Sequence, residues 1–434
     1  MPANANEDLY LGIDVGTSGI RAIVIDGQHN IVGTSQQSLP APIHAPDNGI
    51  EQDANIWWQT LLDVLKALTK STPFTNIKRI ALDGTSATVL LADNKGIPLA
   101  PALMYNDART TQQVDKLSSI APDDVPVHQT SAALPKFMWL FEQDFATDAH
   151  YALHQADWLS GKLTGAFGVS DVNNCVKTGF DVMQHCWPNW LAKASINTKC
   201  LPEVKLPGSE IAVIEPQLAD ELGFNANTKI ISGTTDSTAA FIATGARLSG
   251  DAVTSLGSTL VLKVINDQPI YNSENGVYSQ PLFIDGNIKW LVGGASNSGG
   301  AVLRKYFNTT QLQKLSSQID LQKPCSLNYY PLLHAGERFP FNDPDKQPTL
   351  TPRPDDDADF LYGIFDGIAT IEQQGYQRLQ QLGAAYPQRV ITVGGGSVNP
   401  VWSAIRKNKL KVSVESAMQT EAAFGAALLA AQHS

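Results

Sequence analysis

Apolar and polar residues alternate along the chain in two series of strand-like and helix-like segments. Short apolar runs at 9–14, 21–26 and 77–82 are bounded by Gly, Asp or Asn, which is typical of buried strands joined by tight turns. The segment 54–69 repeats its apolar residues at helical spacing and follows Asp53, a residue type that caps helices well. The first half of the chain is therefore predicted to be an α/β domain that begins with a strand meander.

A similar order of elements begins again near residue 250. Strands are predicted at 252–256 and 259–265, separated by a short turn that contains Gly and Ser. Further strands are predicted at 89–92, 229–232 and 389–393, and further helices at 237–244, 298–307, 360–382 and 421–431. A chain of 434 residues exceeds the ~250–300 residues at which single cores stop growing. We therefore expect two related α/β domains in tandem.

The composition excludes several classes of function. The net charge is −11 and no long run of Lys or Arg occurs, which argues against a nucleic-acid binder, because phosphate contacts dominate that affinity. The four cysteines include no CxxC pair, no apolar run approaches the ~20 residues of a membrane span, and the first residues lack the features of a signal peptide. We expect a cytoplasmic protein that contacts neither nucleic acid nor membrane, and the oligomeric state is left open.

Four turns that follow predicted strands carry side chains suited to chemistry. Open α/β sheets bind ligands beyond the carboxyl ends of their strands, so these turns are the candidate site. They occupy residues 14–19, 233–236, 255–259 and 394–402. The chain has no GxxxxGK motif followed by Ser or Thr, so any ATP is not held by a Walker loop.

The first turn combines Asp14 with Gly16, Thr17, Ser18 and Gly19. Glycines let consecutive backbone N–H groups surround a phosphate, and the two hydroxyls can donate hydrogen bonds to it. A carboxylate faces a phosphate only when a cation lies between them, so Asp14 indicates Mg²⁺. The alternative is a plain β-turn without a ligand.

The second turn ends at Asp236, which begins a predicted helix. The N-terminus of a helix favours the ionised carboxylate, which can accept a proton from a substrate hydroxyl. Phosphoryl transfer has a loose transition state, so the position of such a base matters more than its basicity. The alternative is an aspartate that only caps the helix.

The third turn lies in the second half of the chain, where Gly257 and Ser258 form another candidate phosphate turn. Its alternative is a simple hairpin turn. In the fourth turn, Gly395 and Gly396 allow a flat ligand to lie against the backbone.

Two further side chains of the fourth turn suit a nucleotide base. Asn399 can hydrogen-bond the edge of the base, and Trp402 can cover its face. The alternative is a flexible strand-to-helix turn with a core tryptophan.

Taken together and in this order, the four turns resemble those of the FGGY carbohydrate kinases, within the actin-like ATPase superfamily. The resemblance extends to motifs at 49–53, 57–58, 156–159, 163–165, 170–174, 293–295, 336–338 and 421–426. It implies an α/β fold of two ribonuclease-H-like domains with a catalytic cleft between them, and a reaction that uses ATP and Mg²⁺. The implied domains are 1–243, joined by a returning C-terminal helix within 417–434, and 244–416.

The resemblance also implies a role for each candidate residue. Asp236 matches the catalytic base, and Asp14 and Asp236 lie beside the metal. The family's nucleotide-binding positions correspond to Thr17, Ser18, Gly257, Ser258, Gly395, Gly396, Asn399 and Trp402.

The sugar is indicated by the segment after the strand that ends at Leu82. Many glycerol kinases carry Arg-Glu there and bacterial xylulokinases Gln-Met-His, whereas this chain has Asp-Gly-Thr-Ser at 83–86. In combination with the segments 155–159 and 294–304 and the short length of the chain, it is similar to the small cyanobacterial and plant sugar kinases assigned to D-ribulose. The resemblance implies that Ser86 joins Asp14 and Asp236 around the ketose, with D-ribulose 5-phosphate as product.

Three alternatives stay open at this point. One is D-xylulose, or another sugar or polyol, as the acceptor. Another is a non-catalytic sugar or nucleotide sensor that keeps the kinase fold. The last is an ATPase that works by domain motion without a sugar.

Overall fold

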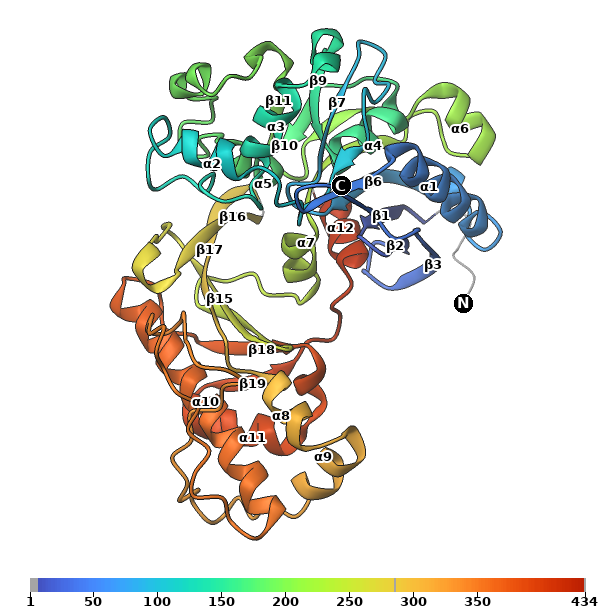
Figure 1. The fold of residues 1–434 in the computed structure, drawn as a ribbon. Coiled ribbons are helices and arrows are strands. Elements are labelled where there is room, and N and C mark those ends of the chain that lie inside the picture. Colours follow the sequence, from blue (N-terminus) through green and yellow to red (C-terminus); the bar gives the residue numbers. More distant parts are fainter. Residues whose placement is uncertain (1–6, 285, 433–434) are drawn as a thin grey trace. The chain divides into compact units, whose positions relative to one another are not determined.

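The computed structural model describes residues 7–284 and 286–432, which fold into two compact units (Figure 1). Unit 1 comprises the described residues up to Ala243 together with those from Glu421 onward, and unit 2 runs from Thr244 to Thr420. Each unit is built on a six-stranded mixed sheet, so the predicted α/β fold class is confirmed.

The large sheet of unit 1 brings three strand ends to one edge. Its central strands β13, β6 and β1 are parallel, and β1 pairs with β2 antiparallel. In spatial order the strands are β12 (Glu210–Val213), β13 (Lys229–Thr235), β6 (Ile77–Gly84), β1 (Leu9–Val15), β2 (Gly19–Ile25) and β3 (Ile31–Ser38). In this register Asp14 pairs with Asp83, and Asp83 pairs with Thr234 on its other side.

A second sheet of unit 1 has five short strands, in the order β4 (Ile43–Ala45), β5 (Gly49–Gln52), β8 (Ala102–Leu103), β7 (Val89–Ala92) and β9 (Tyr151–His154). A two-stranded sheet pairs β10 (Val169–Asp171) with β11 (Glu203–Lys205). The helices of the unit are α1 (Ala54–Leu68), α2 (Thr111–Leu117), α3 (Ala133–Phe141), α4 (Gln155–Thr164), α5 (Val172–Cys175), α6 (Pro216–Leu222), α7 (Asp236–Ala243) and α12 (Ala422–Ala431).

The large sheet is covered on its two faces by different cores. Alternate residues of β1 face opposite sides, so Leu11 packs into a cluster with Trp57 of α1, whereas Tyr10 packs with the alanines of α12. Figure 1 shows α12 in red beside the blue strands, although the two are at opposite ends of the sequence. The small side chains of α12 let it approach the sheet closely.

The closest approach of α12 to the sheet occurs at Gly12. A Cβ atom at this position would lie 2.0 Å from the carbonyl oxygen of Ala423 and 2.2 Å from the backbone nitrogen of Ala427. Because both clashing atoms are backbone, the helix would have to move. Gly12→Ala is expected to lower the stability of unit 1 by about 1–3 kcal/mol or more, measured as the shift of the urea unfolding midpoint.

Gly27→Ala is the matched control, since no atom lies within 4 Å of a Cβ atom built there. Its unfolding midpoint is expected to stay close to that of the wild type, within about 0.5 kcal/mol. Equal midpoints for the two variants would contradict the close packing of α12 on β1.

Unit 2 repeats the pattern of two antiparallel strands joined by a glycine turn, followed by further strands and helices. In spatial order its strands are β16 (Tyr278–Ile284), β17 (Asn287–Ser296), β15 (Leu260–Asn266), β14 (Asp251–Leu256), β18 (Arg389–Val393) and β19 (Ser413–Ser416). Its helices are α8 (Gly300–Tyr306), α9 (Thr309–Ser316), α10 (Asp357–Gln381) and α11 (Pro400–Leu410).

A buried ion pair joins the two long helices of unit 2. Arg406 of α11 donates from Nε and Nη2 to the carboxylate of Glu372 on α10, at 2.6 and 2.7 Å, and both side chains are fully buried. Thr392 of β18 accepts a further hydrogen bond from Arg406 at 2.7 Å, so the pair also ties the helices to the sheet.

The predicted elements agree with the observed ones apart from their ends. The strand predicted at 229–232 continues to Thr235, because its residues still pair with β6. The helix predicted at 360–382 begins at Asp357, where Asp356 accepts a hydrogen bond from the N–H of Ala358.

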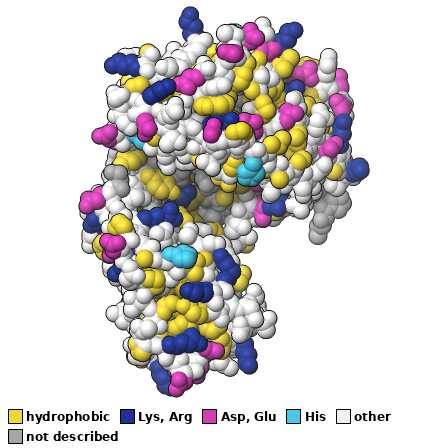
Figure 2. All heavy atoms as spheres, in the orientation of Figure 1, with side chains coloured by type: hydrophobic (Ala, Val, Ile, Leu, Met, Phe, Trp, Pro, Cys, Tyr) yellow, Lys and Arg dark blue, Asp and Glu magenta, His cyan; other side chains and the backbone are white. Residues whose placement is uncertain are grey.

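On the face shown in Figure 2, acidic and basic side chains are interspersed, and neither kind of charge dominates. Among the helices of residues 7–284 and 286–432, none combines the length and the apolar character that crossing a bilayer requires.

Candidate active site

Three carboxyl groups stand at the strand-end edge of the large sheet in unit 1. Asp14 lies near the end of β1, Asp83 near the end of β6, and Asp236 is the first residue of α7, directly after β13. Because β1, β6 and β13 run parallel, their carboxyl ends meet at one edge. The structure therefore brings the candidate residues Asp14 and Asp236 to one edge, and Asp83 lies between them.

The carboxyls of Asp14 and Asp83 are neighbours on paired strands, close enough for one to donate a hydrogen bond to the other. Neither oxygen of Asp83 has a donor among the other described residues, so this bond forms only when one of the two carboxyls is protonated. Complete burial raises the pKa of Asp83 well above its usual value, and the charges of Asp14 and Asp236 raise it further. The proton of the pair accordingly resides on Asp83, which donates to Asp14.

Burial also raises the pKa of Asp14, although the hydrogen bond from Asp83 opposes this. The charge of Asp236 adds to the rise and that of Arg21 reduces it. Asp14 is thus the member of the pair that keeps the negative charge more easily, as a group beside a cation must.

Asp236 is half-buried at the N-terminus of α7. Its Oδ1 accepts a hydrogen bond from the backbone N–H of Ser237 at 2.7 Å. The helix N-terminus stabilises the carboxylate, so the capping role and the role of a base are compatible. Lys177, whose own pKa is lowered by burial, interacts electrostatically with Asp236 and was not predicted from the sequence.

Ser86 lies in a tight turn of residues 85–88, which we call the Ser86 turn. Its two flanking threonines are tied together, because the hydroxyls of Thr85 and Thr88 are 2.6 Å apart. Gln155 Oε1 accepts hydrogen bonds from both the N–H and the hydroxyl of Thr85, each at 3.0 Å. Since the turn directly follows β6, the half-buried Ser86 lies at the same sheet edge as Asp83.

The turn between β1 and β2 holds the predicted phosphate-binding hydroxyls. The N–H of Gly16 donates to the carbonyl of Gly19 at 3.0 Å, and the carbonyl of Ser18 accepts from Leu39 at 2.9 Å. Thr17 is half-buried and Ser18 exposed. Both follow Asp14 within four residues, so they share its edge of the sheet.

Unit 2 contains a cavity of about 600 Å³. Its lining includes all six residues of this unit that were predicted to bind a nucleotide: Gly257, Ser258, Gly395, Gly396, Asn399 and Trp402. The remaining wall comes mainly from α8 and α9, whose contribution the sequence did not indicate. A cavity of this size is within the range of small-molecule and cofactor sites.

Asn399 and Trp402 have structural partners as well as places in the cavity wall. Asn399 Oδ1 caps α11 by accepting from the N–H of Trp402 at 3.0 Å, and Nδ2 donates to Ser316 at 2.8 Å. The Trp402 ring is 2% exposed and stacks on Phe365, with ring centroids 4.7 Å apart and planes 9° from parallel. Trp402 therefore forms part of the cavity's inner wall rather than a lid.

Arg304 of α8 is the charged residue among those that line the cavity. Its Nη2 donates to the hydroxyl of Ser258 at 2.7 Å, beside the second candidate phosphate turn. Arg304 was not predicted from the sequence, because a single arginine in a helix usually indicates a solvated face. Gly299 and Gly300, at the start of α8, are a local feature that could have indicated a nearby ligand.

The carboxylates of unit 1 fit the way proteins hold Mg²⁺ in phosphoryl transfer. Within residues 7–284 and 286–432, no three His, Cys, Asp or Glu side chains form a metal cage. Mg²⁺ commonly uses only one or two carboxylates, with water and substrate phosphates completing its octahedron. Asp14 and Asp236 supply that number.

Comparison with solved structures identifies the class of protein from its fold. A protein described as a "xyloylose kinase" from Brucella ovis superposes with a TM-score of 0.85 and 25% identity, covering 97% of this chain and 90% of its own. Xylulose kinase from Rhodospirillum rubrum gives a TM-score of 0.83 at 20% identity, with 98% and 89% coverage. The chain therefore has the two-domain actin-like ATPase fold of sugar kinases.

The family follows from the sequence. The N-terminal domain model of the FGGY family of carbohydrate kinases matches residues 9–243, and the C-terminal domain model matches residues 252–433. The chain belongs to the FGGY family of carbohydrate kinases, as its motifs predicted. It is 23% identical to the xylulose kinase of Staphylococcus xylosus, over 97% of this chain and 90% of that protein. It is 24% identical to the xylulose kinase of Escherichia coli, over 91% and 83%.

Proposed function

We propose that the protein transfers a phosphoryl group from ATP to the terminal hydroxyl of D-ribulose, giving D-ribulose 5-phosphate. The observation that carries the proposal is the edge of the unit 1 sheet, where Asp14, Asp236 and the Ser86 turn meet. A ketopentose acceptor is further supported by the names of the relatives from S. xylosus and E. coli, both xylulose kinases.

In this proposal each group of unit 1 has one task. Asp236 accepts the proton of the attacking hydroxyl, and Thr17 and Ser18 donate hydrogen bonds to phosphate oxygens. Ser86 and Asp14 orient the sugar. Mg²⁺, held by Asp14 and Asp236, would neutralise charge on the phosphate during transfer.

Unit 2 is proposed to hold the nucleotide in the cavity lined by Gly257, Gly396 and Trp402. The apolar inner wall suits the adenine ring, and Arg304 beside Ser258 suits the phosphates. The cavity thus offers an apolar surface for the base and a charged donor for the phosphates.

Arg304→Met is expected to weaken ATP binding about 10- to 100-fold, since a charge-assisted hydrogen bond contributes about 1.5–3 kcal/mol. Adenosine, which lacks phosphates, is expected to bind the variant and the wild type equally. Isothermal titration with ATP and with adenosine separates the two effects. Lys305→Met is the matched control, because Lys305 is the next residue of α8 but does not line the cavity. Equal loss of ATP and adenosine binding would contradict the phosphate contact.

The proposed activity is tested by ADP release from ATP and Mg²⁺ with D-ribulose, L-ribulose, D-xylulose, L-xylulose, glycerol and gluconate, beside a reaction without sugar. Preference for D-ribulose is the expected result. Preference for D-xylulose, the acceptor that the names of the relatives suggest, would keep the mechanism and reject the specificity assigned to Ser86. ADP release that no sugar stimulates would reject sugar phosphorylation and favour the sensor or the ATPase.

A further inference from the structure

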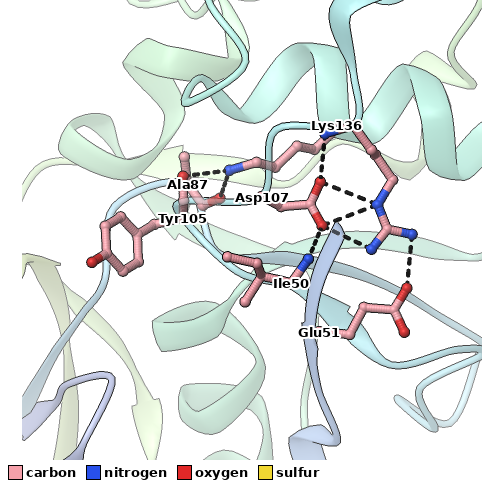
Figure 3. Close-up of polar contacts among 7 residues, drawn as sticks. Ile50, Glu51, Ala87, Tyr105, Asp107 and Lys136 are labelled. Atoms are coloured by element: carbon pink, nitrogen blue, oxygen red, sulfur yellow. Dashed lines mark hydrogen bonds and ion pairs between the residues drawn. The ribbon is translucent and has the colours of Figure 1, made fainter. Parts of the chain in front are cut away.

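Lys136 is a fully buried lysine in α3 of unit 1. Its Nζ donates to the backbone carbonyl of Ala87 and to that of Tyr105, each at 2.9 Å (Figure 3). Burial lowers the pKa of Lys136 to about 7, although the carboxylate of Asp107 opposes the change. Burying an ammonium group is costly, and the two hydrogen bonds to backbone carbonyls offset part of that cost in a way that an apolar side chain would not need.

The first carbonyl belongs to the Ser86 turn. Ala87 follows Ser86 directly and has a φ of 67°. This value lies in the left-handed region, which residues other than glycine rarely adopt. Such a backbone persists only where its surroundings hold it. The hydrogen bond from Lys136 to Ala87 is one such restraint, and the bonds of Thr85 to Gln155 are another.

The second carbonyl belongs to residues 104–107, which we call the Tyr105 segment. Its backbone is also tied to the Ser86 turn, because the N–H of Tyr105 donates to the hydroxyl of Thr88 at 3.0 Å. Tyr105 is 40% exposed, so this segment reaches the surface next to the Ser86 turn that its N–H contacts. Lys136 therefore links two segments that are adjacent in space and belong to separate parts of the sequence.

The Tyr105 segment is fixed from its other side by Asp107. Asp107 accepts a hydrogen bond from the N–H of Ile50 at 2.7 Å and from Nε of Arg109 at 3.0 Å. Arg109 also pairs with Glu51 at 2.7 Å. With the Tyr105 segment held in this way, the bond from Lys136 fixes the Ser86 turn against a rigid support.

We propose that Lys136 is a positioning residue for the sugar acceptor, which sets the separation of the Ser86 turn from the Tyr105 segment and thereby the fit of the sugar. The proposal rests on the proposed function, in which Ser86 contacts the acceptor. Displacing a substrate-positioning group by about 1 Å can reduce rate or affinity by up to about 100-fold. The nucleotide cavity lies wholly in unit 2, so nucleotide binding is not expected to depend on Lys136.

The test compares Lys136→Met with Lys136→Gln in the full-length enzyme. Methionine fills a similar volume without a donor, and glutamine keeps a shorter, uncharged donor. The KM for the sugar is expected to rise about 10-fold or more for the methionine variant and by a smaller factor for the glutamine variant. The KM for ATP, and ATP binding measured without sugar, are expected to stay within about twofold of the wild type.

Arg79→Met is the matched control for the general cost of removing a buried cation. Arg79 is 9% exposed, lies on β6 four residues before Asp83, and donates to the carbonyl of Gly208 at 2.9 Å. It resembles Lys136 in bonding backbone carbonyls but lies away from the strand-end edge. Its replacement is expected to lower the thermal unfolding midpoint and to leave the sugar KM unchanged.

Three results would overturn the proposal. They are an unchanged sugar KM in Lys136→Met, an equal rise of the KM values for sugar and ATP, and failure of both Lys136 variants to fold, which would assign the lysine to stability alone. The sugar used is the one that the wild type prefers, so an acceptor other than D-ribulose still tests Lys136. A wild type without sugar-stimulated turnover would instead reject the proposed function itself.

Discussion

Asp236→Asn is expected to reduce kcat about 10²- to 10⁴-fold, because an amide cannot accept the proton of the attacking hydroxyl. The amide oxygen can still accept the hydrogen bond from the N–H of Ser237, so the start of α7 is expected to stay intact. Binding of ATP in the absence of Mg²⁺ is expected to be unchanged, since the cavity proposed for the nucleotide belongs to unit 2. Steady-state turnover and calorimetric titration with ATP measure the two quantities separately.

Asp53→Asn controls for the change of an aspartate at a helix N-terminus. Asp53 caps α1 by accepting a hydrogen bond from the N–H of Asn55 at 2.9 Å, as Asp236 accepts one from Ser237, but it lies away from the strand-end edge. Its replacement should leave kcat within about twofold, because asparagine caps helices as well as aspartate does. Turnover of Asp236→Asn within about threefold of the wild type would place the base elsewhere.

Much of the fold could be predicted because its signals are local. The strand 9–14 and the helix 54–69 were predicted from apolar spacing, and Asp236 from a strand followed by a carboxylate and a helix. The capping of α11 by Asn399 also had a local signal, a proline directly after the asparagine. Such features depend on residues within one or two turns of each other.

The groups that were missed depend on contacts between distant segments. The sequence around Lys136 gives no sign of its burial, because its two acceptors are 49 and 31 residues away. The pairing of Asp83 with Asp14 depends on the register between β6 and β1, which a single sequence does not specify. A core position for Trp402 was one of two interpretations, and its partner in the stack, Phe365 of α10, is remote in the chain.

Asp83→Asn is expected to make the protein more stable at pH 8 than the wild type. In the folded protein burial raises the pKa of Asp83 well above its usual value, so the folded state keeps a proton that the unfolded state releases above about pH 4. Stability from a carboxyl with a raised pKa is present at low pH and is lost as the pH rises. Asparagine has no such proton, so the variant is expected to gain about 1–3 kcal/mol at pH 8 and less at pH 5.

Asp26→Asn is the control, because its expected effect on stability at pH 8 has the opposite sign. Burial acts to raise the pKa of Asp26, but hydrogen bonds from Asn30 and Gln28 outweigh it and lower the pKa overall. A carboxyl with a lowered pKa stabilises the fold above its unfolded pKa, so its replacement is expected to destabilise the protein at pH 8 and less at pH 4. Urea midpoints at pH 4, 5, 6.5 and 8, without nucleotide or metal, give both profiles.

Activity measurements on two Asp83 variants distinguish a role for the protonated carboxyl from a role for the ionised carboxylate. Asparagine can donate from Nδ2 to Asp14 as the protonated carboxyl does, so Asp83→Asn is expected to keep kcat/KM within about threefold of the wild type. Asp83→Leu removes the donor, leaves Asp14 without its orienting hydrogen bond, and is expected to lower kcat/KM about 10- to 100-fold. If asparagine and leucine reduced activity equally, Asp83 would act as an ionised carboxylate, and the neutral state that its burial favours would not be the working one.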